Sequence, residues 1–377
     1  MIMKILKLIS INLFFLILFI EIASFIFVDF KNISTRPTYK YQLRNHYGDY
    51  NKYFGAWHIP SSFYNHRKSC FDVNYSFNSY GARDDERQIV SENKNRVVVL
   101  GDSVVEGYGV EDKNRITNLL ESRTGIPHLN FGTSGHFGTT QYFLNYKYLS
   151  SKFSHNKVFL FFTITNDFED DSFEIGKKIH FARYRPYFSY DEINKNFNLF
   201  YFDKKNLNNK KYLETIRNIL SNYTYSYHVL RYYFSIIKST TSKTIDISQT
   251  KNLDKFDKRE VEINSYLYNY NEKVFSIIKN NLININKLAK LNSAQLYIIP
   301  VGHQREHGHY INLKKYPKLL TELKELSLKN NIIFIDAFTN LKISNKNVNN
   351  YFFSCDSHHN SEGNILIANY IYEKIYK

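Results

Sequence analysis

Four polar segments carry residue types that could perform chemistry, and two of them hold the parts of a nucleophilic site. Ser103 follows the apolar run at 96–100, within Gly-Asp-Ser. Near the C-terminus, Asp356 precedes the adjacent pair His358 and His359. A hydroxyl nucleophile, an imidazole base and a carboxylate that orients the imidazole make up a hydrolytic triad. A serine at a helix start is also a common N-cap, so Ser103 alone has a structural interpretation as well.

The other two polar segments lie between these ends. The segment GTSGHFG at 132–138 has three glycines in seven positions, which suits a loop whose backbone closely approaches a ligand. Asn166 follows the apolar run at 157–163. Backbone amides at the helix start after Ser103 could stabilise an anion that develops during a reaction.

Five short apolar runs must position these segments: RVVVL at 96–100, HLNF at 128–131, KVFLFFT at 157–163, QLYIIP at 295–300 and IIFID at 332–336. None alternates cleanly with polar residues, which is typical of strands covered on both faces of a parallel sheet. Helical patterns lie between or after the runs, at 112–123, 139–153, 271–291, 313–329 and 361–376. The predicted class is therefore α/β with helices on both faces, and ligands bind beyond the carboxyl ends of such strands.

The chain is predicted to have three parts. These are an N-terminal membrane anchor over 1–30, an N-terminal extension over 31–90 that packs on the catalytic domain, and the catalytic domain over 91–377. The alternation of strand and helix lapses at about 168–270, a stretch rich in Tyr, Asn and Lys. We interpret it as an inserted, mostly helical region.

An apolar segment near the N-terminus predicts a membrane anchor. The 21 residues Leu8–Val28 would rise about 31 Å as a helix, enough to cross a bilayer core. Their length and the lack of a small-residue cleavage site favour an uncleaved signal anchor over a signal peptide. Basic residues lie on both sides of the span, so their count does not set its orientation. Because a long domain translocates largely regardless of charge, we expect a single-pass protein with an extracytoplasmic catalytic domain.

Composition narrows the classes of partner. The 377 residues are 43% hydrophobic and 23% charged, which excludes a disordered chain and a polytopic membrane protein. The net charge of +15 comes from lysines spread along the whole chain, so we interpret it as compositional bias and expect no nucleic-acid partner. The two cysteines, Cys70 and Cys355, exclude a disulfide scaffold and leave their pairing open.

The polar segments together resemble the SGNH/GDSL hydrolase superfamily. Gly101-Asp102-Ser103 resembles the family's first block, Asn130–Gly135 its second, Asn166-Asp167 its third, and Asp356 with the histidine pair its fifth. The resemblance implies a flavodoxin-like three-layer α/β/α fold with a five-stranded parallel sheet. It also implies a catalytic serine, Ser103, and an oxyanion hole that includes the Gly135 amide and the Asn166 side chain. Upstream, 78–84 resembles a segment of membrane-anchored members.

Two positions depart from the family's pattern. The third block usually has Gly two residues before its Asn, where this chain has Ile164. The fifth block usually has three steps from Asp to His, which His359 satisfies, but the His is usually followed by Asn at +2 and Gly at +5, which only His358 satisfies. A shorter Asp-x-His form occurs in some relatives. We therefore predict His358 as the base, with His359 as the alternative.

Two other patterns have competing interpretations. His303-Gln-Arg-Glu-His307 matches the zinc-ligand pattern of some peptidases, but its flanking glycines indicate a loop. We prefer a loop that contacts substrate or solvent, and we predict no metal and no organic cofactor. Glu169, Asp170, Asp171 and Glu174 could bind a cation, but we prefer to interpret this acidic run at 169–174 as a solvated loop.

The sequence thus predicts a membrane-anchored serine esterase with the triad Ser103, His358 and Asp356. The amides of Ser103 and Gly135 and the side chain of Asn166 would form its oxyanion hole. The expected partner is an ester substrate, and the resemblance and predicted location suggest an O-acetylated glycan. The alternatives are an O-acetyltransferase of a cell-surface polysaccharide, which uses the same acyl-enzyme, and a non-catalytic glycan-binding protein.

Overall fold

The computed structural model describes residues 2–40, 49–92, 94–179, 184–202, 211–241, 262–344 and 346–377. Its chain divides into two compact units, and each is described by itself. The larger unit comprises Asn45–Tyr64, Asn74–Leu207 and Thr250–Lys377. The smaller unit comprises Met1–Arg44, Asn65–Val73 and Asn208–Gln249.

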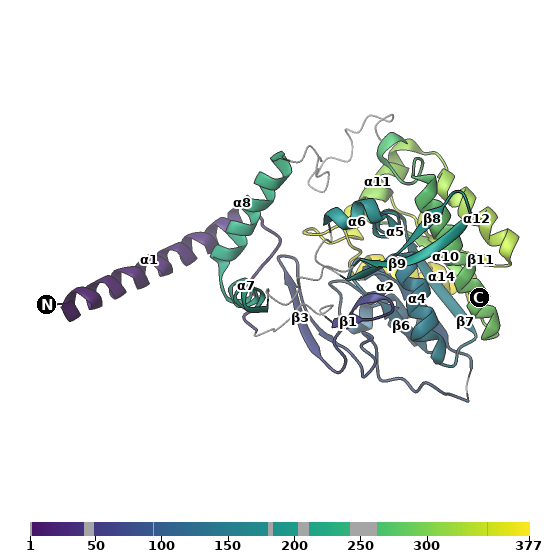
Figure 1. The fold of residues 1–377 in the computed structure, drawn as a ribbon, viewed down its shortest axis with the longest axis horizontal. Helices are drawn as coiled ribbons and strands as arrows, with labels where there is room; N and C mark the ends of the chain where they lie inside the picture. The colour runs from purple at the N-terminus through teal and green to yellow at the C-terminus, as the bar shows by residue number, and fades with distance from the viewer. Residues whose placement is uncertain are drawn as a thin grey trace. The chain divides into compact units, whose positions relative to one another are not determined.

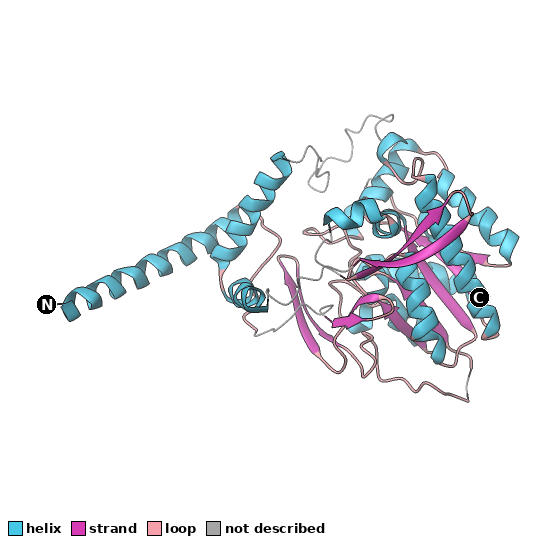
Figure 2. Ribbon diagram, in the orientation of Figure 1, coloured by secondary structure: helices cyan, strands magenta, loops and turns pink. Residues whose placement is uncertain are grey.

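A parallel sheet of five strands forms the centre of the larger unit (Figure 2). Its strands are β5 (Val97–Gly101), β6 (His128–Gly132), β7 (Lys157–Thr163), β10 (Gln295–Val301) and β11 (Ile333–Phe334). They lie in the order β6-β5-β7-β10-β11, which in chain order is 2-1-3-4-5, the flavodoxin-like arrangement. All five predicted runs form strands, and the predicted α/β class is confirmed.

Alternate side chains of each strand are buried on opposite faces of the sheet. In β5, Val97 and Val99 belong to one hydrophobic cluster, Val98 and Leu100 to another, and none of the four is exposed. The cluster of Val98 and Leu100 includes side chains from α4 (Thr139–Tyr148), α10 (Glu272–Leu291) and α12 (Lys318–Asn330). The other cluster includes side chains from α3 (Ile116–Thr124) and α14 (Ser361–Ile375). Because both faces are covered, the strands have no polar side, which explains their continuous apolar runs.

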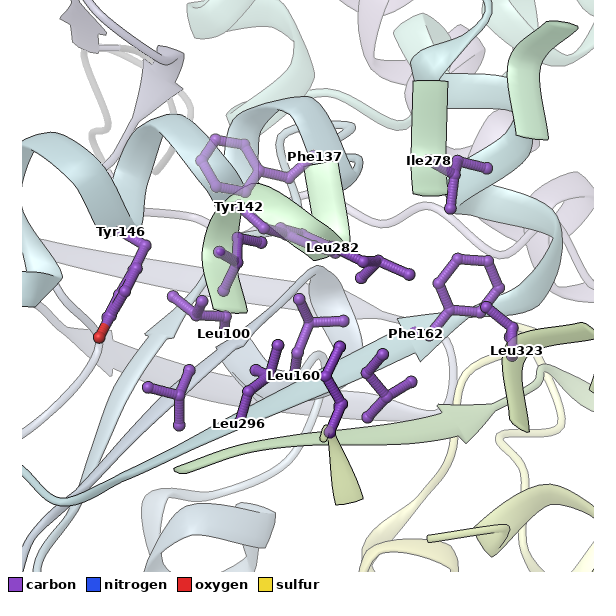
Figure 3. Packing of buried hydrophobic residues seen from close by; sticks show 14 of the residues in the cluster. Leu100, Phe137, Tyr142, Tyr146, Leu160, Phe162, Ile278, Leu282, Leu296 and Leu323 are labelled. Carbon is purple, nitrogen blue, oxygen red and sulfur yellow. The ribbon is translucent and has the colours of Figure 1, made fainter. Parts of the chain in front are cut away.

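Figure 3 shows part of the cluster that contains Leu100. Ile278 and Leu282 of α10 lie one helical turn apart and pack on the same side of the sheet as Leu160 and Phe162 of β7. This i, i+4 spacing gives α10 the apolar stripe of a helix that covers a sheet. The predicted helix at 271–291 is therefore confirmed.

Helix ends follow local signals in the sequence. α3 ends at Thr124, and its C-cap Gly125 has a φ of 65°, the left-handed conformation that favours glycine. The predicted helix at 139–153 ends earlier, at Tyr148, and a 3₁₀ turn follows it. The other helices and turns of the larger unit are α2 (Ser103–Glu106), α5 (Ile164–Asp171), α6 (Phe173–Ile179), α11 (Gln304–Leu313), α13 (Ala337–Asn340), η1 (Asp112–Asn114), η2 (Ser150–Lys152) and η6 (Val348–Asn350).

The stretch predicted as a mostly helical insertion also contains a hairpin. β8 (Arg185–Asp191) and β9 (Asn196–Phe202) pair antiparallel after α6. Residues 180–183, 203–210 and 242–261 of this stretch lie outside the described residues. The acidic run at 169–174 is not a solvated loop, because Asp170 and Asp171 are buried in α5.

These two buried aspartates have specific partners. Asp170 forms an ion pair with the buried Arg185 at 3.2 Å. Asp171 accepts hydrogen bonds from the backbone amides of Thr139 and Thr140, at 3.1 and 2.9 Å, and so caps the start of α4. The interpretation of this run as a solvated loop was wrong because its partners are distant in sequence.

Two short strand pairs precede β5. β1 (Asp49–Asn51) pairs antiparallel with β2 (Gly55–Trp57), and β3 (Phe63–Lys68) pairs with β4 (Phe71–Ser76). The division at residue 90 between an extension and the catalytic domain stays a prediction.

Among its described residues, the smaller unit contains three helices. α1 (Ile2–Phe30) has 29 residues, a length of about 43 Å, and is long and apolar enough to cross a membrane. α7 (Lys211–Tyr223) and α8 (Tyr225–Thr241) are separated by one residue, Thr224. α8 lies beside the C-terminal half of α1 (Figure 1).

Candidate active site

Ser103 lies at the carboxyl end of β5, as the sequence predicts. Asp102 connects the strand to α2 and is the N-cap, because one of its carboxylate oxygens accepts the backbone N–H of Val104 at 3.0 Å. The same oxygen accepts a hydrogen bond from the Thr163 hydroxyl of β7 at 2.9 Å. Since Asp102 caps the helix, the Ser103 hydroxyl is not used as the cap.

The Ser103 hydroxyl instead faces His358. Its Oγ lies 2.7 Å from Nε2 of His358. The other ring nitrogen, Nδ1, makes a short hydrogen bond to the Asp356 carboxylate. The same carboxylate oxygen also accepts the backbone N–H of His358 at 3.1 Å. A carboxylate at Nδ1 favours the tautomer with a proton there, which leaves Nε2 to accept the serine proton.

The loop that carries His358 is fixed by the start of α14. Asn360 is the N-cap of α14 and accepts the backbone N–H of Gly363 at 3.1 Å. Its side-chain amide donates to the carbonyl groups of Asn350 and Phe352, at 2.9 and 3.2 Å. A Cβ on Gly363 would collide with the Tyr351 carbonyl oxygen, so this position requires glycine. These contacts explain why Asn and Gly follow the histidine at +2 and +5.

His359 packs against Phe352 and does not hydrogen-bond Ser103. It forms a β-bridge with Phe352, and the two rings lie 4.6 Å apart. His359 is 3% exposed, and burial holds the pKa of its imidazole well below the usual value. Neighbouring residues in an extended segment point to opposite sides, so only one of the two histidines can face Ser103. The structure brings His358 to Ser103 and leaves His359 in the interior.

Two aromatic rings flank His358. Tyr108 stacks on it with 4.0 Å between ring centres and 15° between planes, and His303 meets it edge-on at 4.7 Å. Burial and the neighbouring His358 lower the pKa of the His303 imidazole. Sequence reasoning missed Tyr108, although it lies only five residues after Ser103.

The segment that contains His303 is a helix and not the predicted loop. His303 is the N-cap of α11, and its backbone N–H donates to the Glu306 carboxylate at 2.8 Å. His307 therefore lies within α11. Its ring is buried against that of Phe338, with 4.5 Å between ring centres. In the part of the chain that the structure describes, no three His, Cys, Asp or Glu side chains are grouped as metal ligands.

Asn166 lies in the first turn of α5, directly after β7, the strand that pairs with β5. Its side-chain amide donates to the second oxygen of Asp102 at 2.8 Å. This contact joins the ends of β5 and β7, where the strand order reverses and ligands bind in such sheets. It uses one of the two amide hydrogens of Asn166. The adjacent Asp167 is buried, and burial with the neighbouring Asp102 and Asp171 carboxylates raises its pKa.

The position of Ile164 explains the departure from the family's third block. α5 begins at Ile164 directly after β7, and the Ile164 side chain is fully buried in the cluster that contains Leu100. A helix needs no glycine at this point, so the substitution is accommodated by the helix start.

Gly135 is buried in a loop that packs against α2. The backbone N–H of the preceding Ser134 makes a short hydrogen bond to the Glu106 carboxylate of α2. Glu106 is fully buried, 3.4 Å from Nε2 of His58, which is also fully buried. A Cβ on Gly132 would collide with the Glu106 backbone nitrogen, so this loop approaches α2 as closely as only glycine permits. Sequence reasoning missed Glu106 and His58, which hold the loop.

A small hollow lies at these residues. It is a tight crevice lined by Ser103, Val104, Tyr108, His358, His359 and Asn364. A larger hollow of about 700 Å³ of empty volume is lined by Arg123 of α3 and residues near the end of α14. None of its lining residues forms a nucleophile–base pair, so the small hollow is the candidate active site.

Comparisons with known proteins find similarity only among solved structures. No family model and no curated protein matches the sequence. A lipolytic protein of the G-D-S-L family from Veillonella parvula is 12% identical, covers 75% of this chain and 98% of its own, and has a TM-score of 0.38. A GDSL-like lipase from Bacteroides thetaiotaomicron is 13% identical over 77% and 92%, with a TM-score of 0.39. A putative lipolytic G-D-S-L protein from Desulfitobacterium hafniense is 12% identical over 74% and 98%, with a TM-score of 0.37. These similarities are too distant to carry an argument about activity.

Proposed function

We propose that this protein is a serine esterase whose triad is Ser103, His358 and Asp356. The observation that carries the proposal is the 2.7 Å contact between Ser103 Oγ and His358 Nε2, with a carboxylate on the opposite ring nitrogen. Hydroxyl, imidazole and carboxylate in this order make a weak nucleophile reactive at neutral pH.

In the proposed first half-reaction, Ser103 Oγ attacks the ester carbonyl carbon while its proton passes to His358 Nε2. Asp356 keeps the ring oriented and stabilises the imidazolium that forms. The carbonyl oxygen becomes an oxyanion, which the amides of Ser103 and Gly135 and the side chain of Asn166 would stabilise. The tetrahedral intermediate then expels the alcohol, which takes its proton from His358, and an acyl-Ser103 ester remains.

In the second half-reaction, a water molecule attacks the acyl-Ser103 ester and gives a proton to His358. Collapse of the new intermediate releases the carboxylic acid, and the proton returns to Ser103 Oγ. We propose acetyl as the acyl group, on the sequence resemblance alone. An O-acetylated glycan outside the membrane is the proposed carrier of that group, on the sequence resemblance and the apolar α1.

Hydrolysis of p-nitrophenyl acetate and of acetylated oligosaccharides by the detergent-solubilised full chain tests the proposal. We expect acetate release that Ser103→Ala abolishes. Ser357→Ala is a matched control, because Ser357 is exposed and lies one residue before His358. Activity that survives in Ser103→Ala would contradict the proposal. Acetyl groups that appear on an added sugar and not as free acetate would instead identify an acetyltransferase.

A further inference from the structure

α7 of the smaller unit has an apolar face that is exposed. Ile216, Ile219, Leu220 and Tyr223 follow the i, i+3, i+4, i+7 spacing that places side chains on one side of a helix. A helix of a soluble protein normally turns such a face toward its core. Here these four side chains are 37%, 43%, 41% and 41% exposed.

α8 repeats the pattern. Leu230, Tyr233, Phe234 and Ile237 have the same spacing and are 59%, 47%, 68% and 58% exposed. The face of α8 that is buried is a different one, around His228. Both helices of the pair therefore expose the side that would ordinarily be covered.

The exposed face of α8 is continuous with the apolar surface of α1. Phe27 of α1 stacks on Tyr233 with 5.7 Å between ring centres, and Phe25 packs edge-on against Tyr225 at 5.1 Å. The outer side chains of α1 are apolar and exposed, for example Phe19 at 69% and Ile26 at 60%. An environment that covers α1 thus extends directly onto α8.

A polar contact of Glu21 fixes the position along α1 at which α8 begins. Glu21 is the acidic residue within the apolar run, and its carboxylate accepts the backbone amides of Tyr225 and Ser226 at 2.8 and 3.3 Å. These are first-turn amides of α8, which α1 thereby caps in place of water. Glu21 precedes Phe30 by nine residues, so α8 begins about 13 Å before the end of α1. The start of α8 therefore lies beside residues of α1 that the predicted span Leu8–Val28 places in the apolar layer of the bilayer.

We propose that the exposed faces of α7 and α8 lie in the interface of the same lipid bilayer that α1 crosses. Tyr223 and Tyr233 are aromatic residues of the kind enriched at that depth. Arg217 and Arg231 are exposed and adjoin the apolar faces in sequence, and such side chains can reach lipid phosphates; Arg217 also donates to the Tyr227 hydroxyl at 3.1 Å. The proposal rests on α1 as a membrane span and is independent of the esterase chemistry.

Quenching of an introduced tryptophan by lipid tests the proposal. The full-length Phe234→Trp and Ile219→Trp variants are reconstituted into vesicles of phosphatidylglycerol and phosphatidylcholine brominated on its acyl chains. Ser235→Trp is the matched control, because Ser235 is exposed and lies about 100° around α8 from Phe234, outside the apolar set Leu230, Tyr233, Phe234 and Ile237. The wild type supplies the background of Trp57, which is 4% exposed.

We expect the acyl-chain bromines to quench the emission of Phe234→Trp and Ile219→Trp strongly and that of Ser235→Trp weakly. Acrylamide in the water should show the reverse order. Equal acrylamide quenching in all three variants would place the faces in water and overturn the proposal. Protection from both quenchers that grows with protein density would assign the faces to a second copy and also overturn it. A chain that fails to enter vesicles would overturn both the span and this surface, whereas esterase activity is measured separately in detergent.

Discussion

The two adjacent histidines, His358 and His359, have the same side chain and opposite surroundings. His358 hydrogen-bonds Ser103 and Asp356, whereas His359 packs among the rings of Phe352 and His307. The sequence predicted this choice from the positions downstream, because Asn360 and the following helix start set the register. The spacing from Asp356 to the histidine is adjustable. With His358 two residues after Asp356, one Asp356 oxygen reaches both the ring and the backbone N–H of His358.

Asn166→Ala tests the oxyanion donor. We expect kcat to fall about 10²–10³-fold, the usual loss for one such donor, while KM changes little. Asp102→Asn should lower kcat in the same direction, because Asp102 accepts the hydrogen bond that orients the Asn166 amide. The measurement is steady-state kinetics beside urea unfolding. A loss of activity that merely follows a loss of folding would show that Asn166 is structural.

Tyr108 is predicted to act through its ring. Tyr108→Phe keeps the face that stacks on His358 and should keep most activity, whereas Tyr108→Ala frees the imidazole. Small displacements of a catalytic group cost up to about 10²-fold in rate, so we expect a loss of kcat toward that size for the alanine variant. The comparison uses both variants at equal folded concentration. An alanine variant as active as the phenylalanine variant would remove any role for the stacking.

At the scale of elements, the sequence predicted the strands that are buried on both faces of the sheet. β5, β7 and β10 are covered on both faces, so their apolar runs could be recognised without knowing their neighbours. The β8–β9 hairpin was missed because it lies in a Tyr-rich stretch and many side chains of β9 are exposed, although residues 199–202 are a short apolar run. α11 was missed because its glycine-rich flanks indicate a loop, whereas the cap from His303 to Glu306 starts a helix. Partners distant in sequence, such as Asp170 and Arg185, leave no local signal at all.

The buried His128, the first residue of β6, makes the free energy of unfolding depend on pH. His128 Nδ1 donates to the Ile126 carbonyl at 2.7 Å, and its Nε2 accepts from the Tyr376 hydroxyl at 2.8 Å. This arrangement fits a neutral ring, and burial lowers the pKa of His128 from 6.5 to about 4. Between these values the unfolded chain binds a proton that the folded chain does not, so the free energy of unfolding falls as the pH falls.

His128→Gln tests this dependence. The wild type should lose about 3 kcal/mol more unfolding free energy than the variant between pH 7 and pH 4, from the pKa shift of this one group. Urea unfolding at several pH values gives the difference. Buried carboxylates with raised pKa, such as Asp167, act in the opposite direction in both proteins and therefore cancel. Parallel curves for the two proteins would contradict the assignment.

At the scale of the molecule, the candidate site belongs to the larger unit alone. The segments that hold Ser103, Asn166 and His358 all lie within it, whereas α1, α7 and α8 belong to the smaller unit. The sequence predicted α1 from its composition. It did not predict that Glu21 caps a helix 204 residues further along the chain, because such pairing follows from the fold and not from local pattern.

A chain that lacks residues 2–29 tests whether esterase activity and membrane binding belong to different units. Esterase activity should remain, because no residue of the candidate site is removed. Binding to anionic vesicles should weaken but persist, since the apolar faces of α7 and α8 remain. Vesicle flotation and p-nitrophenyl acetate hydrolysis measure the two properties. Loss of activity in a truncated protein whose larger unit is still folded would show that the site depends on the anchor.

Fluorophosphonate labelling tests the central claim, that His358 activates Ser103, without knowledge of the natural substrate. The reagent phosphonylates a serine only when a neighbouring base removes its proton, and mass spectrometry of peptides locates the label. We predict a single label on Ser103 in the wild type and in His359→Ala, and almost none in Ser103→Ala or His358→Ala, each verified as folded by circular dichroism. A label on another serine, or a folded His358→Ala protein that reacts at the wild-type rate while His359→Ala does not, would contradict the account.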